Sequence, residues 1–158
     1  MRRLKNPGSG KLFTGILELP AVARRLSVVD VELCVGCMMC VFACSRRFGD
    51  GGVAKSAIRV ASIGGIERGF RVIVCRACPD PPCAASCPTG ALKPRKGGGV
   101  LMDPKKCVSC GNCVRACPIG AVMWDEESNK PIICVHCGIC AQYCPYGVIE
   151  LEEVRASA

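Results

Sequence analysis

Sixteen cysteines dominate the chemistry available to this 158-residue sequence, and they fall into four runs of four. Three runs share the spacing C-x2-C-x2-C-x3-C, and the second run along the chain reads C-x2-C-x4-C-x3-C. The runs are Cys34, Cys37, Cys40 and Cys44; Cys75, Cys78, Cys83 and Cys87; Cys107, Cys110, Cys113 and Cys117; and Cys134, Cys137, Cys140 and Cys144. No cysteine is left over, so we interpret all sixteen as metal ligands.

The spacing favours iron-sulfur clusters over other uses of cysteine. A tight loop with three cysteines presents three thiolates to one face of a cuboidal cluster, and the fourth ligand then comes from elsewhere. Proline follows the last cysteine in three runs, at Pro88, Pro118 and Pro145, where it ends the helical turn. Zinc sites favour two separated pairs, and disulfides need an oxidising compartment. The sequence therefore predicts four 4Fe-4S clusters.

Composition and charge exclude several classes of function. The formal net charge is +8 and aromatic residues make up only 4% of the chain, so the ordinary apolar core is thin. Four oxidised clusters with their thiolates would each add about −2, which brings the charge near zero and gives no reason to expect nucleic-acid binding. No apolar stretch is long enough for a membrane span, and no signal-peptide pattern is present, so a cytoplasmic location is expected. We find no nucleophile with a base and no nucleotide motif, and we expect no catalytic site on this chain.

The segments between the runs predict short strands, turns and helices. We expect a strand over residues 28–32 that enters the first run and another over 147–154 that leaves the last. Glycine-rich or polar turns predict hairpins that join 58–63 to 70–74, 91–93 to 100–103, and 121–125 to 131–134. Helices of one or two turns are expected in the C-x3-C segments. The predicted fold class is α+β, with two bacterial-ferredoxin-like units organised around the clusters.

The stretch from Cys75 to Ala91, with two prolines before its third cysteine, resembles a motif of a known family. It is similar to the second motif of the four-cluster ferredoxin subunits that serve tungsten and molybdenum pterin oxidoreductases, and the resemblance covers residues 28–152. It implies that the two units are nested, with the first run paired with the fourth and the second with the third. The implied ligand sets are Cys34, Cys37, Cys40 with Cys144; Cys134, Cys137, Cys140 with Cys44; Cys75, Cys78, Cys83 with Cys117; and Cys107, Cys110, Cys113 with Cys87. Sequential pairing of the runs is the alternative.

The compact fourth cysteine run indicates which members of this family the chain resembles. The fourth run, Cys134 to Cys144, lacks the long insertion usual in the subunits of dimethyl-sulfoxide-reductase-type enzymes. In this it looks like the small iron-sulfur subunits of tungsten aldehyde oxidoreductases, in the aldehyde ferredoxin oxidoreductase family. The resemblance implies an electron-transfer subunit of a hetero-oligomer, placed between a tungstopterin aldehyde-oxidising catalytic subunit and a flavoprotein, NAD or ferredoxin.

Two alternative functions remain open on the sequence. One is a free-standing polyferredoxin carrier. The other is a wiring subunit of a class II benzoyl-CoA reductase, a formate dehydrogenase or a hydrogenase complex.

The resemblance also suggests a division of the chain. We expect an N-terminal docking extension over 1–27, an outer two-cluster unit over 28–57 and 126–158, and an inner two-cluster unit over 58–125. His136, the only histidine, is expected to be a surface loop residue, although its place beside Cys137 would also let it tune a cluster. The arginines close to cluster cysteines, Arg46, Arg47, Arg76 and Arg115, would raise cluster potentials or lie in solvent.

Overall fold

The computed structural model describes residues 23–64 and 69–154, and in these ranges the chain forms short strands and helices in alternation. The longest helix, α1, has 8 residues. The strands are β1 (Ala23–Val28), β2 (Arg59–Ser62), β3 (Phe70–Ile73), β4 (Leu92–Pro94), β5 (Val100–Met102), β6 (Met123–Asp125), β7 (Lys130–Ile132) and β8 (Ile149–Val154). The helices are α1 (Met39–Arg46), α2 (Pro82–Ala85), α3 (Asn112–Ala116) and α4 (Ile139–Gln142). The predicted α+β character and the short helices within the C-x3-C segments are confirmed.

The strands pair as four antiparallel sheets of two strands each. Three of them, β2 with β3, β4 with β5 and β6 with β7, are hairpins of consecutive strands, as the turn-flanked segments predicted. The fourth sheet pairs the first strand with the last, and its register places Leu26 opposite Leu151 and Val28 opposite Ile149. This pairing brings the start and the end of the described chain together.

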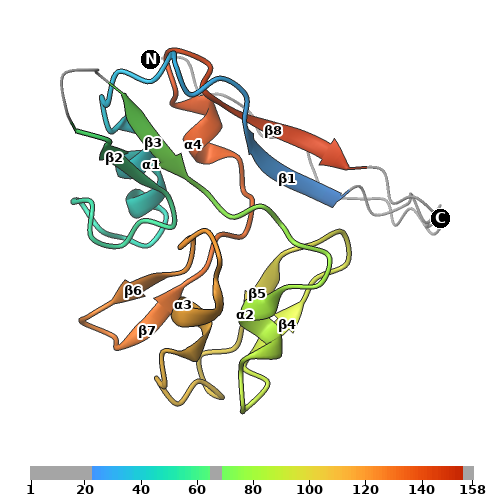
Figure 1. Ribbon diagram of the computed structural model, residues 1–158. Coiled ribbons are helices and arrows are strands. Elements are labelled where there is room, and N and C mark those ends of the chain that lie inside the picture. The colour runs from blue at the N-terminus through green and yellow to red at the C-terminus, as the bar shows by residue number, and fades with distance from the viewer. Residues whose placement is uncertain (1–22, 65–68, 155–158) are drawn as a thin grey trace, which may run out of the picture.

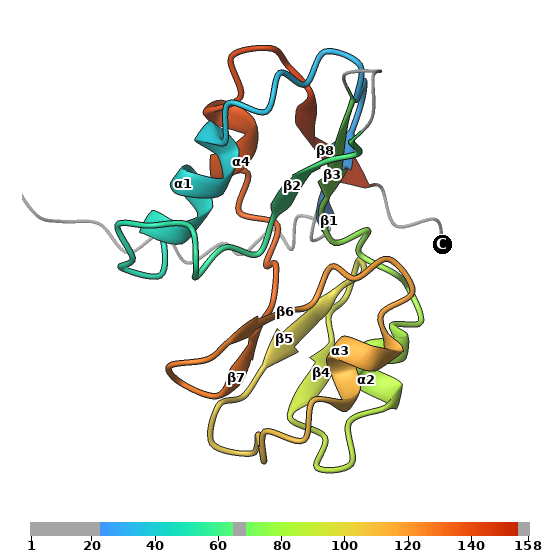
Figure 2. The same ribbon diagram turned by 60° about the vertical axis from the view of Figure 1, so that its left-hand side comes forward.

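The elements divide into two units that lie one above the other in Figure 1. We call β1, α1, β2, β3, α4 and β8 the terminal unit, and α2, β4, β5, α3, β6 and β7 the central unit. Within the terminal unit α1 packs against α4, and within the central unit α2 packs against α3, as Figure 2 shows from another side. The helices of the first and fourth cysteine runs are therefore neighbours, and so are those of the second and third.

The entering strand lies earlier in the chain than the sequence predicted. The prediction of residues 28–32 was wrong because β1 covers Ala23–Val28 and the chain turns at residues 31–33. The Asp30 side chain, just before this turn, accepts a hydrogen bond from the Glu32 backbone N–H at 2.9 Å. Residues 23–27, which we had expected in the N-terminal extension, thus form most of β1. The rest of that expected extension, residues 1–22, lies outside the described residues.

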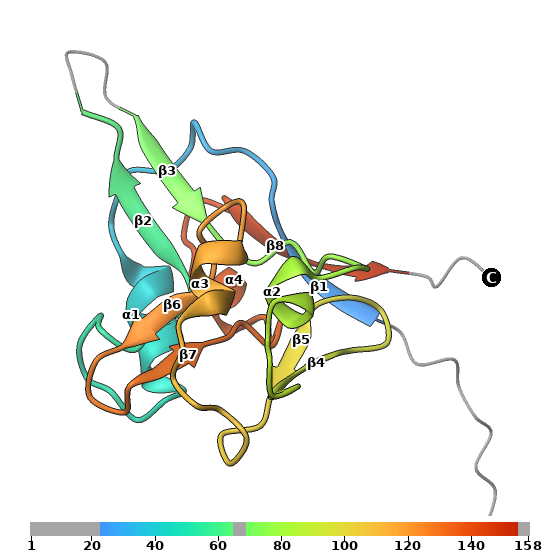
Figure 3. The same cartoon turned by 60° about the horizontal axis from the view of Figure 1, so that its bottom comes forward.

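The boundary between the units also differs from the expected one. The β2–β3 hairpin was assigned to an inner unit over 58–125, yet Ile58, Val60 and Val74 are buried in the same core as Leu26 and Val41 of the terminal unit. Figure 3 shows this hairpin extending away from the body in a different direction from β1 and β8. The hairpin joins the terminal unit because its apolar side chains pack against residues that are distant in the sequence. The position of the hairpin along the chain does not predict this packing.

The β6–β7 hairpin contributes to both cores. Met123 and Ile132 are buried in the core of the terminal unit, whereas Val122 and Ile133 are buried in the core of the central unit. Val122 and Ile133 directly flank the two strands, so the hairpin and the residues next to it contact both cores.

Both cores are built largely from cysteines and small aliphatic residues, in keeping with the low aromatic content. Within residues 23–64 and 69–154, no helix has the length and apolar character needed to cross a bilayer.

Candidate iron-sulfur cluster sites

The same backbone turn recurs in all four cysteine runs. The residue immediately before the second cysteine has a positive φ in every run: 70° at Gly36, 51° at Ala77, 57° at Ser109 and 56° at His136. Three of these residues carry a side chain, and such residues adopt the left-handed region rarely and at a cost in energy. Gly36 has a further constraint, because a Cβ there would lie 2.3 Å from the Phe70 ring.

A second left-handed residue begins the helix in three of the runs. Met38, Gly111 and Gly138 are the N-caps of α1, α3 and α4. The second run lacks this residue and instead starts α2 with Pro81 at the N-cap and Pro82 in the first turn, where proline's fixed φ suits the helix. The longer x4 spacing of the second run therefore reflects a different way of starting the same short helix.

Four cavities of the described chain are lined by cysteines from two runs. Each is lined by the first three cysteines of one run and the last cysteine of another run, and the cavity of Cys75 has Cys134 as a fifth. The lining sets are Cys34, Cys37, Cys40 and Cys144; Cys44, Cys134, Cys137 and Cys140; Cys75, Cys78, Cys83 and Cys117; and Cys87, Cys107, Cys110 and Cys113. Every one of the sixteen predicted site residues is thus brought to a cavity with the partners that the resemblance implied.

The four cavities have similar linings, in which thiols lie among apolar side chains. The cavity of Cys75 has a volume of about 150 Å³, and the other three have volumes of about 20, 20 and 10 Å³. In the described ranges, no three His, Cys, Asp or Glu side chains gather as they would around a single metal ion. All sixteen cysteines are free thiols, so each is available as a ligand.

Burial and neighbouring thiols act on the acidity of the cysteines. Burial raises the pKa of Cys134 and of Cys140 to about 12. It raises the pKa of Cys40 to about 11, and the neighbouring Cys144 thiol adds to that rise across the two runs. A thiol in such a site keeps its proton at neutral pH until a metal displaces it, so cluster binding must release protons.

The sulfur atom of the last cysteine in each run takes part in hydrogen bonds. Three of these sulfur atoms accept a backbone N–H at 3.3 Å, and the donor–acceptor pairs are Ala57 with Cys44, Ala121 with Cys117, and Val148 with Cys144. At Cys87, burial opposes ionisation, but backbone N–H groups and the Thr89 hydroxyl lower the pKa on balance. Hydrogen bonds to sulfur are one of the means by which a protein tunes the potential of a cluster.

Exposure separates the cysteines within a run. Cys37, Cys110 and Cys137, each the second cysteine of its run, are exposed, whereas Cys40, Cys113 and Cys140, the third cysteines, are buried. Each of these three sites therefore has one side open toward the surface and one side enclosed by the protein.

His136 is buried, with only 4% of its surface exposed, so the expectation of a surface loop residue was wrong. Its Nδ1 accepts a hydrogen bond from the backbone N–H of Leu26 on β1 at 3.0 Å. Burial, reinforced by the positive charge of Arg95, lowers the pKa of His136 to about 4. The neutral ring thus fastens the fourth cysteine run to the first strand.

Arg95 joins the two units, and sequence reasoning missed it. From the turn between β4 and β5 in the central unit, its guanidinium donates to the backbone carbonyls of Val135 at 3.0 Å and Arg24 at 3.1 Å, both in the terminal unit. A third bond goes to the carbonyl of Gly98 in its own turn at 3.2 Å. Nothing in the sequence distinguishes this residue from other basic residues in turns.

Cys134 lies where the two units meet. It lines the cavity that it shares with Cys44, and it also lines the cavity of Cys75 in the central unit. The thiols of Cys75 and Cys44 both add to the burial-driven rise in the pKa of Cys134. The terminal and central sites are therefore adjacent at this cysteine.

Cavities lined by thiols from paired runs are the expected sites of an iron-sulfur protein. The chain belongs to the 4Fe-4S dicluster domain family, whose model matches residues 67–154, more than half of its length. The model of a 4Fe-4S binding domain also matches residues 31–47, which contain the first run.

Several relatives have names that describe subunits of oxidoreductases. The chain is 36% identical over 104 residues to a selenate reductase subunit of Mesobacillus selenatarsenatis, an alignment that covers 63% of this chain and 36% of the relative. It is 35% identical over 99 residues to a tetrathionate reductase subunit of Archaeoglobus fulgidus, covering 62% and 47%. It is 37% identical over 100 residues to formate hydrogenlyase subunit 2 of Escherichia coli, covering 63% and 47%. The chain thus spans less than half the length of each of these relatives.

Proposed function

We propose that this chain is the electron-transfer subunit of an oxidoreductase complex and that it holds four 4Fe-4S clusters. The observation that carries the proposal is the set of four cavities: the lining of each includes the first three cysteines of one run and the last cysteine of another. The proposed ligand sets are Cys34, Cys37, Cys40 with Cys144; Cys134, Cys137, Cys140 with Cys44; Cys75, Cys78, Cys83 with Cys117; and Cys107, Cys110, Cys113 with Cys87.

Nested pairing is better supported than sequential pairing. Sequential pairing would need Cys44 beside the first three cysteines of the second run, but Cys44 lies in a cavity with Cys134. The second run shares its cavity with Cys117, whose thiol also contributes to the raised pKa of Cys83.

A bound 4Fe-4S cluster supplies one-electron redox chemistry, and the residues of this chain would hold and tune it. The thiolates would bind iron, and the N–H donors of Ala57, Ala121 and Val148 would stabilise negative charge on sulfur. The apolar side chains that complete each cavity would exclude water from the buried side. The chain's own contribution is therefore binding and tuning, with no substrate chemistry assigned to it.

The cavities suggest an order for the sites. Cys134 lines two cavities, that of Cys44 and that of Cys75. We therefore propose that these two sites are neighbours and form the middle of the electron-transfer path. The site of Cys37 and the site of Cys110 would then be the two ends, and both of these cysteines are exposed.

A partner subunit is proposed to cover the end at Cys37. Val35 and Tyr146 line the same cavity as Cys37 and are 52% and 49% exposed. Exposed apolar side chains grouped in this way suit a protein interface. We propose a tungsten- or molybdenum-pterin catalytic subunit as the partner because several relatives are named as reductase subunits.

The finer proposal is an aldehyde-oxidising tungstopterin partner, with a flavoprotein, NAD or ferredoxin on the other side of the transfer. This proposal is supported by the fourth cysteine run, which has the spacing C-x2-C-x2-C-x3-C from Cys134 to Cys144 and no long insertion. A free-standing carrier is less well supported, because the relatives reported above are named as subunits of larger enzymes.

Anaerobic affinity purification of the tagged full chain from its native host tests the proposal. We expect a larger subunit to elute with it, and metal analysis to find iron together with tungsten or molybdenum. Tungsten would support the aldehyde-oxidising partner, and molybdenum would point to another enzyme of the same broad class. Elution alone at a size near 16.7 kDa, with iron but no second subunit, would instead identify a free carrier.

A further inference from the structure

A large open groove runs between β1, β3 and the turn that follows α3. Its volume is about 980 Å³, far larger than a site for one small ion. Four arginines line it, Arg25, Arg59, Arg71 and Arg76, and no aspartate or glutamate does. The lining of the groove is therefore strongly basic, whereas the chain as a whole carries 13 acidic residues beside its 21 basic ones.

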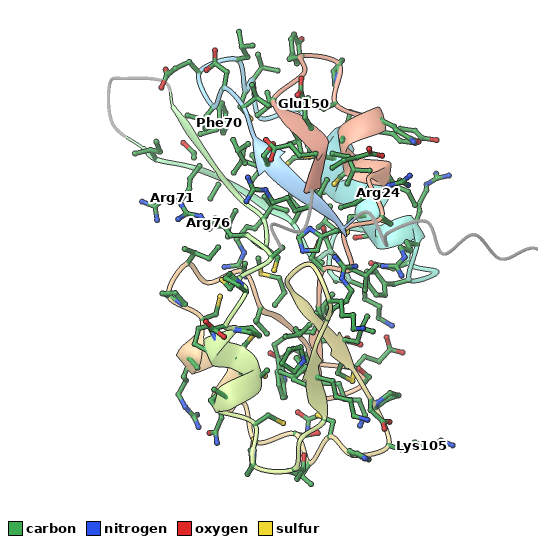
Figure 4. All side chains as sticks on the ribbon, turned by 90° about the vertical axis from the view of Figure 1, so that its right-hand side faces the viewer. Arg24, Phe70, Arg71, Arg76, Lys105 and Glu150 are labelled. Atoms are coloured by element: carbon green, nitrogen blue, oxygen red, sulfur yellow. The ribbon has the colours of Figure 1, made fainter. Side chains whose placement is uncertain are left out.

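Three of the four arginines have no ion pair within the part of the chain that the structure describes. Arg25 pairs with Glu152 at 2.9 Å, whereas Arg59, Arg71 and Arg76 are exposed and make no such contact there. The register of the β2–β3 hairpin, with Arg59 opposite Ile73 and Ala61 opposite Arg71, places Arg59 and Arg71 on one face. Figure 4 shows Arg71 and Arg76 on the same side of the molecule, at the level where the units meet.

The groove adjoins three of the cysteine-lined cavities: it shares Val72 with the cavity of Cys37, Leu26 and Val74 with the cavity of Cys44, and the most residues with the cavity of Cys75. Arg76, Pro118 and Ile119 line the groove, and the same three residues line the cavity of Cys75, Cys78, Cys83 and Cys117. A molecule seated in the groove would therefore lie directly beside this cavity. The walls also include Phe70, Val72 and Ile73 of β3, so the groove combines positive charge with apolar surface.

We propose that this groove docks an acidic loop of a small electron-carrier protein. The proposal rests on the proposed electron-transfer function and adds a docking site beside the cavity of Cys75, Cys78, Cys83 and Cys117, with which the groove shares the most residues. Charge complementarity argues for an acidic occupant, and the length of the groove and its apolar wall argue for a protein loop over a small anion.

Charge reversal on the exposed face of the hairpin tests the groove without changing a residue that lines a cysteine cavity. The test variant is Arg59→Glu with Arg71→Glu, and a milder version is Arg59→Gln with Arg71→Gln in case the reversal impairs folding. The matched control is Lys93→Glu with Lys105→Glu, which changes the net charge equally on exposed residues of the central unit. Figure 4 shows Lys105 at the far end of that unit, well away from Arg71 and Arg76.

The measurement is the association rate of an acidic two-cluster ferredoxin with the full, cluster-loaded chain, at low and at high salt. Steering by opposite charge speeds association by roughly 10- to 1000-fold, so reversing two of the four arginines should slow it about tenfold at low salt. The difference should fall to about twofold or less at high salt, and the control pair should change the rate by about twofold or less.

Three results would overturn the proposal. The first is an equal loss in the test and control variants, which would show only a general effect of net charge. The second is no binding of the ferredoxin by either the unaltered chain or the variant. The third is arginine-dependent binding of inorganic phosphate without binding of the ferredoxin, which would identify a small-anion site. Iron content and reduction by dithionite, measured on the same samples, report on the clusters separately, so failure of the groove is distinguishable from failure of the electron-transfer function.

Discussion

The contact most open to a decisive test is the one that Arg95 makes between the two units. Replacing Arg95 by alanine removes the bonds to the carbonyls of Val135 and Arg24 and leaves both acceptors without this donor. The bond to Gly98 is lost as well, but it lies within the central unit and does not hold the units together. The change should therefore weaken the junction more than it weakens either unit.

The size of the effect follows from the kind of bond. A hydrogen bond from a charged donor contributes about 1.5 to 3 kcal/mol, and the lower end applies here because Arg95 is partly exposed. Two such bonds give about 3 kcal/mol, or roughly a 100-fold increase in the population of an opened junction. The backbone N–H of Leu26 is a reporter beside the junction, because Leu26 and its acceptor His136 closely follow Arg24 and Val135, whose carbonyls lose the Arg95 donor.

Hydrogen–deuterium exchange of the cluster-loaded chain, followed by mass spectrometry, measures this opening. In Arg95→Ala we expect exchange to rise by about 100-fold in peptides that contain Leu26. Lys96→Ala removes an exposed neighbour and should leave the exchange unchanged, whereas Arg95→Lys keeps the charge and should show an intermediate effect. Equal exchange at Leu26 in Arg95→Ala and Lys96→Ala would refute the role given to the guanidinium.

Three further results are expected. A fragment over residues 75–133 keeps the eight cysteines of both central sites and should bind about eight iron atoms, whereas a chain cut before Cys134 should lose both terminal sites; fewer than two clusters on the fragment would count against nested pairing. Removing the clusters should abolish cooperative unfolding and the native circular dichroism, because cysteines make up much of both cores; an apoprotein that keeps both signals would contradict this. Folding raises the pKa of the Cys40, Cys134 and Cys140 thiols above their ordinary value, so cluster binding must release protons. The retention of iron in the presence of a chelator should therefore rise between about pH 7 and about pH 9. Iron retention that does not depend on pH would contradict the assignment of these thiols as ligands.

Local sequence signals predicted much of the fold. The three hairpins were predictable because turn residues such as Gly64 and Gly97, both with positive φ in the structure, separate short apolar segments. The short helices were predictable because proline ends the runs and the C-x3-C spacing fits about one turn.

Long-range features could not be predicted in the same way. The β2–β3 hairpin packs in the core of the terminal unit through Val60 and Val74. The residues around them in the sequence do not predict which core they join. Likewise, His136 is buried by β1, which lies more than a hundred residues earlier in the chain. Such contacts depend on tertiary packing, which overrides local propensity.

The candidate cluster sites likewise combine features that local sequence predicts with features that depend on long-range contacts. Spacing alone predicts four clusters and groups the first three cysteines of each run, because those residues are close in sequence. The fourth member of each set, such as Cys144 beside Cys40, comes from a distant run and was implied only by the family resemblance.

Anaerobic iron and sulfide analysis combined with a reductive titration tests the central claim most directly. The four proposed ligand sets require about 16 iron atoms and about 16 sulfides per chain, and about four electrons should be taken up as the clusters are reduced. Replacing Cys144 by alanine should lower these numbers by about one cluster, because its thiol lines only one of the four cavities. A chain that binds zinc in place of iron, or that takes up no more than about two electrons at full iron loading, would contradict the account.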